Sequence, residues 1–93
     1  MRKVTPTNRN VFEDLGFDKA EALNLRIRSE LMMIIDEYIT RKGLTQKAAA
    51  ELMGVDQPRI NKLLKGRIEL FTIDLLVKML ERVGIRMELK KAA

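Results

Sequence analysis

Residues 45–66, TQKAAAELMGVDQPRINKLLKG, restrict the fold of this 93-residue chain more than any other stretch. Thr45 suits a helix N-cap, and the alanines, glutamate and leucine that follow favour a short helix, which Gly54 ends in a left-handed conformation. Asp56 suits the cap of a second helix, and Pro58 falls in its first turn, where the missing N–H would have no partner. The stretch therefore predicts two short helices joined by a tight turn.

The side chains of this stretch predict how the two helices meet. Ala50 is small where crossing helices approach closely, and the second helix would bury Ile60, Leu63 and Leu64 on one face. Its other face carries no carboxylate after the cap and consists of Gln57, Pro58, Arg59, Asn61, Lys62 and Lys65. These features are typical of a helix-turn-helix whose second helix enters the major groove of DNA. The alternative is an ordinary antiparallel hairpin with a solvated polar face.

The net charge of +5 is concentrated on the same part of the chain. Residues 41–67 hold seven Lys or Arg side chains against two acidic ones, whereas residues 1–40 sum to −1 and residues 68–93 to +1. A basic surface of this kind matches a phosphate backbone. A membrane-binding helix needs an apolar face free for lipid, but here those faces are needed for the core. RNA is less suitable, because none of the four aromatic residues lies among the basic ones to stack bases.

Residues 45–66 resemble the helix-turn-helix of the Cro/phage-repressor (XRE) family, whose characteristic spacing is matched at Gln46, Ala50, Gly54 and Ile60. Longer segments resemble the small XRE proteins that include HigA-type antitoxins, over NVFEDLGF, EALNLRIRSEL, GLTQKAAAELMGVDQPRINKLLKGRIELFTIDLLVKML and VGIRMEL. The likeness covers residues 11–89. It implies a lambda-repressor-like, all-α fold of about five helices. It also implies a repressor that binds a palindromic operator in double-stranded DNA, either as a stand-alone regulator or as the autoregulating antitoxin of a toxin–antitoxin operon.

The resemblance also assigns roles to individual residues. Gln57 takes a base-reading position, and glutamine can pair with adenine at two points, as arginine or lysine can with guanine. Pro58 departs from the pattern because it offers no polar group, although its ring can touch a thymine methyl. The expected base-reading residues are Gln57, Pro58, Arg59, Asn61 and Lys62. The expected phosphate-binding residues are Gln46, Lys47, Lys65 and Arg67.

The rest of the chain predicts a single helical domain with a short C-terminal β-strand. Asp18 suits the cap of a long helix over Lys19–Lys42, and Thr72 the cap of a last helix that ends near Gly84. Residues 85–89 alternate apolar and polar side chains as a half-buried strand does, and a strand needs a partner. The partner is either the chain near Val11 or the same strand of a second subunit. A homodimer is expected, with an interface formed by Leu76, Leu80, Ile85, Met87 and Leu89.

Residues 1–17 are expected to form an N-terminal arm ahead of a helix-turn-helix domain over residues 18–93. Residues 1–10 show no periodic pattern and are expected to be loose. Phe12, Leu15 and Phe17 pack either on the domain itself or on a partner, and the HigA-type resemblance implies that this partner is a toxin protein. Both interpretations of the arm are open.

The composition argues against catalysis and against a bound cofactor. The chain has no cysteine and no histidine, which removes disulfides, thiolate chemistry and nearly every zinc or haem site. The only serine, Ser29, has no histidine to activate it. We therefore expect that the protein is not an enzyme and binds no cofactor or metal. Since the sequence shows no membrane span and no signal peptide, we expect a cytoplasmic, nucleoid-associated protein. A protein-interaction module without DNA readout is the remaining alternative.

Overall fold

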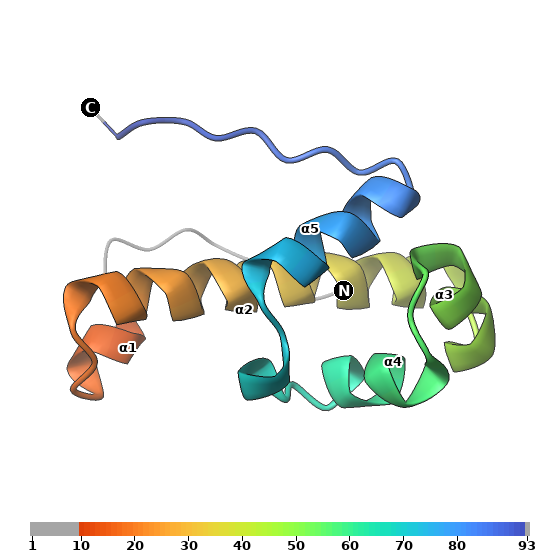
Figure 1. Cartoon of the computed structure of the whole chain (residues 1–93), viewed down its shortest axis with the longest axis horizontal. Helices are drawn as coiled ribbons and strands as arrows, with labels where there is room; N and C mark the ends of the chain where they lie inside the picture. Colours follow the sequence, from red (N-terminus) through yellow and green to blue (C-terminus); the bar gives the residue numbers. More distant parts are fainter. Residues whose placement is uncertain (1–9, 93) are drawn as a thin grey trace.

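The computed structural model describes residues 10–92, which form five α-helices and one 3₁₀ turn (Figure 1). The helices are α1 (Val11–Asp14), α2 (Lys19–Lys42), α3 (Gln46–Met53), α4 (Gln57–Leu64) and α5 (Ile73–Arg82), and the turn η1 (Ile68–Leu70) lies between α4 and α5. The predicted all-α class and number of helices are confirmed for this part of the chain. The long helix has the bounds that its sequence predicted.

Four of these helices begin at the polar residues predicted as caps. The side chains of Asp18, Thr45, Asp56 and Thr72 each accept a hydrogen bond from the backbone amide three residues later, at 2.8, 3.0, 2.9 and 3.2 Å. The first turn of a helix leaves backbone amides without a hydrogen-bond partner, and each cap side chain accepts from one of them. Each such bond stabilises its helix by about 1 kcal/mol. Local side-chain chemistry therefore places the starts of these helices.

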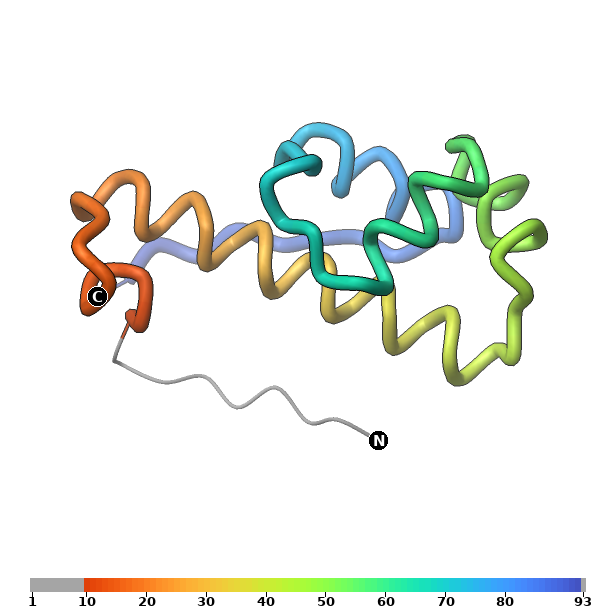
Figure 2. Tube along the Cα trace, turned by 90° about the horizontal axis from the view of Figure 1, so that it is seen from below, coloured from red at the N-terminus to blue at the C-terminus, as the bar shows by residue number. Residues whose placement is uncertain are grey.

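Helix α2 forms the long axis of the molecule. Its 24 residues extend over about 36 Å, close to the longest dimension of 37 Å. In Figure 1, α5 lies above α2 and α4 below it, α1 folds beneath one end, and α3 stands at the other end. Seen from below in Figure 2, α4 and η1 lie in front of α5. No helix within residues 10–92 is both long and apolar enough to cross a membrane.

The hydrophobic core lies where α2, α3, α4 and α5 converge. Its largest fully buried side chains are Phe71, Ile35, Met53, Ile60, Leu76, Met79 and Leu80. Among these side chains, only Phe71 lies outside the helices, at the position directly after η1. Its burial therefore anchors the η1 turn to the rest of the domain.

The predicted strand over residues 85–89 is not formed within this chain, and no strand occurs anywhere in residues 10–92. Ile85 is the last residue tied to the domain, because its amide donates to the Leu80 carbonyl at 3.0 Å and its side chain packs on the core. The following residues run back along α2 as a tail with exposed side chains (Figures 1 and 2). Val11, near the other expected partner, is helical in α1. Within residues 10–92, no neighbouring strand pairs with the backbone groups of the tail.

Two residues predicted for the dimer interface belong to the core instead. Leu76 and Leu80 of α5 are both 0% exposed, so neither has surface to offer to a second subunit. Val77, which lies between them on the same helix, is 40% exposed. The structure therefore removes Leu76 and Leu80 from the expected interface. It leaves Ile85, Met87 and Leu89, of which the last two are exposed.

The predicted N-terminal arm is described from Asn10 onward, and the expectation for residues 1–9 lies outside the described part of the chain. Helix α1 packs against α2, and the rings of Phe12 and Phe17 meet edge to face, with centroids 6.3 Å apart. Neither ring belongs to the core, and Val11 and Leu15 are 57% and 73% exposed. The arm is thus attached to α2 while its aliphatic side chains face outward.

Candidate nucleic-acid interface

The turn between α3 and α4 brings the two helices close together. Gly54 adopts a φ of 72°, which permits the chain to reverse at the end of α3, and the Val55 amide then donates to the Ala50 carbonyl at 3.1 Å. Ala50 is buried between the helices, and Ile60 of α4 is 0% exposed. The two predicted helices and the tight turn between them are confirmed, and the turn fixes the orientation of α4 on the domain. Leu64, which was predicted to be buried with Ile60 and Leu63, is only half buried.

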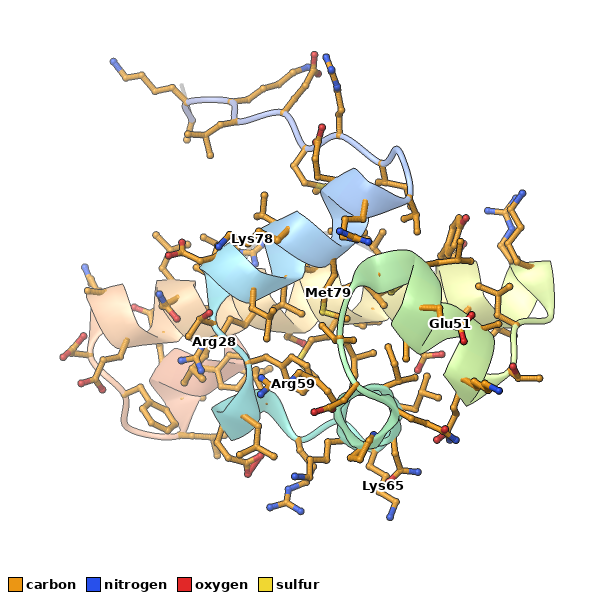
Figure 3. All side chains as sticks on the ribbon, turned by 45° about the vertical axis from the view of Figure 1, so that its right-hand side comes forward. Arg28, Glu51, Arg59, Lys65, Lys78 and Met79 are labelled. Carbon is orange, nitrogen blue, oxygen red and sulfur yellow. The ribbon has the colours of Figure 1, made fainter. Side chains whose placement is uncertain are left out.

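Helix α4 has a buried face and an outward face. Ile60 and Leu63 are buried, whereas Pro58, Lys62 and Lys65 are exposed. The three exposed residues are spaced i, i+4 and i+7, so they form one stripe opposite the core. Figure 3 shows Lys65 pointing away from the domain on the side opposite Lys78 of α5. The outward face of α4 therefore offers two cations and no carboxylate.

The other predicted base-reading residues flank this stripe. Gln57 is exposed at the first position of α4, and Asn61 is half buried on one flank. Arg59 is half buried on the other flank, where its guanidinium carbon lies 5.9 Å from the centre of the Phe71 ring. Such a distance is within the range of a cation–π contact. The structure thus brings all five predicted residues onto α4, but it holds Arg59 against the domain.

The predicted phosphate-binding residues lie around α4. Gln46 opens α3 and is half buried, and Lys47 beside it is exposed. Lys65 caps the end of α4, and Arg67, two residues later, is the residue directly before η1. Arg67 already has a partner, because its Nε lies 3.3 Å from a carboxylate oxygen of Glu69. Both side chains of this pair are more than half exposed, so the ion pair contributes little and can be exchanged for a phosphate.

Few acidic groups oppose these cations. The carboxylate of Asp56 accepts from the Arg59 amide and is therefore engaged as the cap of α4. Glu69 is the pairing partner of Arg67. No group of His, Cys, Asp and Glu side chains in residues 10–92 is arranged to hold a metal ion. With Asp56 and Glu69 both engaged, the exposed Lys62 and Lys65 make the surface around α4 suited to an anion.

Sequence reasoning missed two arginines that support this surface. Arg82 of α5 donates to the Leu52 carbonyl at 3.3 Å and lies against Gly54, where an added Cβ would be 2.7 Å from its Nε. Arg28 of α2 donates to the carbonyls of Ile68 and Phe71. Both arginines contact backbone far away in the sequence, so no local pattern could have identified their partners.

Comparison with protein families adds an independent finding. A family model described as a helix-turn-helix domain matches residues 11–90, which is most of the chain. The comparison with curated proteins found no match. The matched region includes α1 and the described tail up to residue 90, as well as the turn between α3 and α4.

Proposed function

The chain belongs to the helix-turn-helix domain family, and on that premise we propose that it binds double-stranded DNA sequence-specifically as a transcriptional repressor. One observation carries the proposal: the outward stripe of α4 presents Lys62 and Lys65 on a helix that Ile60 anchors in the core. A short helix of this kind fits the major groove, which is wide enough to admit it. The proposal gives the chain a binding role and assigns it no reaction.

The residues of the surface would divide into two roles. Gln57, Arg59 and Lys62 carry groups that can hydrogen-bond to base edges, and Pro58 can contact a thymine methyl. Lys47, Lys65 and Arg67 surround them and suit the sugar–phosphate backbone, to which Gln46 at the start of α3 can also donate. Base contacts determine the sequence that is preferred, whereas phosphate contacts determine how strongly affinity falls with salt.

Three single substitutions test this division of roles. Lys62→Ala should reduce discrimination at one base pair by about 1–3 kcal/mol, because it removes a contact to a base edge. Lys65→Ala should weaken binding to all duplexes alike, and lower the slope of log K against log salt by about one unit. Lys78→Ala is the matched control, because Lys78 is an exposed lysine on the far side of the domain (Figure 3). The measurement is a set of salt titrations with a duplex selected from a random pool.

Two results would contradict the proposal. If no duplex is enriched by the unsubstituted protein, the domain does not read DNA sequence. If Lys78→Ala weakens binding as much as Lys65→Ala does, the protein binds DNA through its overall charge and not through α4.

We also propose that the protein acts as a homodimer on a palindromic operator. One short recognition helix covers about half of a site, whereas specific interfaces bury roughly 1,000–2,500 Å² of protein surface. The tail supports this proposal, because Met87 and Leu89 are exposed and Leu89 reaches 98% exposure. In a two-fold dimer, the tails of two subunits would pair as strands and cover these side chains.

A second candidate function is that of an antitoxin, and the observation that favours it is the exposed arm. Val11 and Leu15 face outward and Phe17 is 42% exposed, so α1 and the residues that follow it present an apolar patch outside the core. Patches of this kind often mark a protein-binding surface. A toxin protein that covers the patch would make this regulator one half of a toxin–antitoxin pair.

Substitution of the arm separates this candidate from a plain repressor. Val11→Glu combined with Leu15→Glu should abolish neutralisation of a toxin encoded beside this gene, because two charges would enter the apolar contact. The thermal midpoint and DNA affinity should stay unchanged, since both residues lie outside the core. Leu52→Glu is the control, as Leu52 is an exposed leucine of α3 at the other end of the domain. Full neutralisation by the arm variant in a growth assay, or the lack of any toxin gene nearby, would exclude the antitoxin role.

A further inference from the structure

Arg28 connects α2 to a part of the chain that is remote in sequence. Its Nη1 donates to the carbonyls of Ile68 and Phe71, at 3.3 and 3.2 Å, across 40 and 43 residues. Its Nε donates to the Asn24 side chain one turn earlier on α2, at 2.7 Å. The guanidinium is therefore held from both sides, by its own helix and by the turn.

The two carbonyls that Arg28 binds lie at the two ends of η1. Ile68 is the first residue of η1, and Phe71 is the residue that caps its end. One charged group thus closes the turn and ties it to α2, and hydrogen bonds to charged donors are stronger than those between neutral groups. The position of the Phe71 backbone therefore depends directly on Arg28.

The side chain of Phe71 supports Arg59 of α4. The Phe71 ring is buried, and the Arg59 guanidinium carbon lies 5.9 Å from its centre. A hollow of about 140 Å³ opens at this place, lined by Asp56, Pro58, Arg59, Lys62, Leu70 and Phe71. Arg59 thus shares one hollow with two other predicted base-reading residues, Pro58 and Lys62. Both arginines, which Figure 3 labels, meet the same residue: Arg28 at the Phe71 carbonyl and Arg59 at the Phe71 ring.

We propose that Arg28 is a positioning residue for DNA readout: it fixes the η1 turn, so that the Phe71 ring holds the Arg59 guanidinium at one angle to the groove. The inference rests on the proposed function, because it assumes that Arg59 meets a base edge. Two parallel hydrogen bonds to guanine require a fixed direction of the guanidinium plane. An arginine free to rotate loses side-chain entropy on binding, whereas one already held on an aromatic ring loses less.

A double-mutant cycle on a selected duplex tests this role. Arg59→Ala should lose about 5- to 150-fold discrimination at one base pair, which identifies the pair that Arg59 reads. Arg28→Ala should lose at least about fivefold discrimination at that same pair, although it contacts no DNA. In the Arg59→Ala background, Arg28→Ala should cause no further loss of discrimination. The readout is the ratio of Kd values for two duplexes that differ at that pair.

Two further variants separate positioning from stability. Arg26→Ala is the matched control, because Arg26 lies on the same helix in a partly exposed pair with Glu30 at 3.9 Å, and it should leave discrimination unchanged. Asn24→Ala removes only the acceptor of the Arg28 Nε, and it should cause a smaller loss at the same base pair. This variant carries the test if Arg28→Ala does not fold.

The outcomes distinguish this inference from the function on which it rests. If the unsubstituted protein selects no duplex, both are wrong. If it selects one and Arg28→Ala retains discrimination, only the positioning role is wrong. The positioning role is also wrong if Arg28→Ala lowers the affinity for all duplexes equally, or if it still lowers discrimination in the Arg59→Ala background. Arg28 would then contribute to stability alone.

Discussion

Removal of residues 86–93 is expected to convert the proposed homodimer into a monomer and to lower its affinity for the proposed operator by about 10²–10⁴-fold. In the proposed dimer, binding of one α4 helix to its half-site holds the second α4 helix at a high effective concentration near the other half-site. A monomer lacks this effect. The cut keeps Ile85, whose amide bonds to the Leu80 carbonyl and whose side chain packs on the core. The remaining domain should therefore stay folded, and its thermal midpoint should fall only by the stabilisation that dimerisation had added. Light scattering measures the mass, and a gel shift with the full palindrome measures the affinity.

Two paired substitutions sharpen this prediction without shortening the chain. Met87→Asp with Leu89→Asp places charges at alternate positions of the tail and should give the same monomer. Arg86→Ala with Glu88→Ala changes the intervening positions, which point to the other face of a strand, and should remain dimeric. The affinity for a single half-site should be the same in both variants. If the shortened protein stays dimeric, the interface lies elsewhere, for instance on the exposed side of α2.

Ile60→Ala is expected to reduce the free energy of unfolding by about 2–5 kcal/mol. Ile60 is 0% exposed and joins α4 to the core, so its truncation leaves a cavity beneath α4. In a domain of this size, each kcal/mol lowers the thermal midpoint by about 4–8 °C, which predicts a total fall of roughly 8–40 °C. Thermal and urea unfolding followed by circular dichroism would measure both quantities.

Lys62→Ala is the matched control on the same helix. Its side chain is exposed, so the free energy of unfolding should change by less than about 0.5 kcal/mol while base discrimination falls. Ile60→Ala should show the opposite pattern, with the base preference kept at temperatures where the variant is folded. If Ile60→Ala instead left the stability unchanged, α4 would not be anchored through this residue.

The local structure around the recognition helix could be predicted from the sequence. Thr45 and Asp56 cap α3 and α4 through side-chain oxygens that reach amides three residues away, and Gly54 takes the left-handed conformation between them. These effects act over a few residues, so the order of residue types is enough to specify them. The buried Ile60 and Leu63 followed in the same way from helical periodicity.

The tertiary structure decided which surface each apolar residue faces. The spacing of Leu76 and Leu80 shows that they share one side of α5, but only the packed fold shows that their own core covers that side completely. Residues 85–89 alternate like a strand, yet a strand forms only where a second backbone pairs with it. The spacing of apolar residues specifies which side of a helix or strand is apolar. It does not specify whether the chain's own core or a second molecule covers that side.

The tertiary structure also decided how the candidate site is supported. The sequence identified Arg59 as a basic residue on the exposed side of a helix, but it did not predict the Phe71 ring beneath its guanidinium. It gave no sign that Arg28 binds two carbonyls, 40 and 43 residues further along the chain. Caps and turns depend on neighbours in the chain, whereas these contacts depend on neighbours in space, and only the folded backbone brings them within hydrogen-bonding distance.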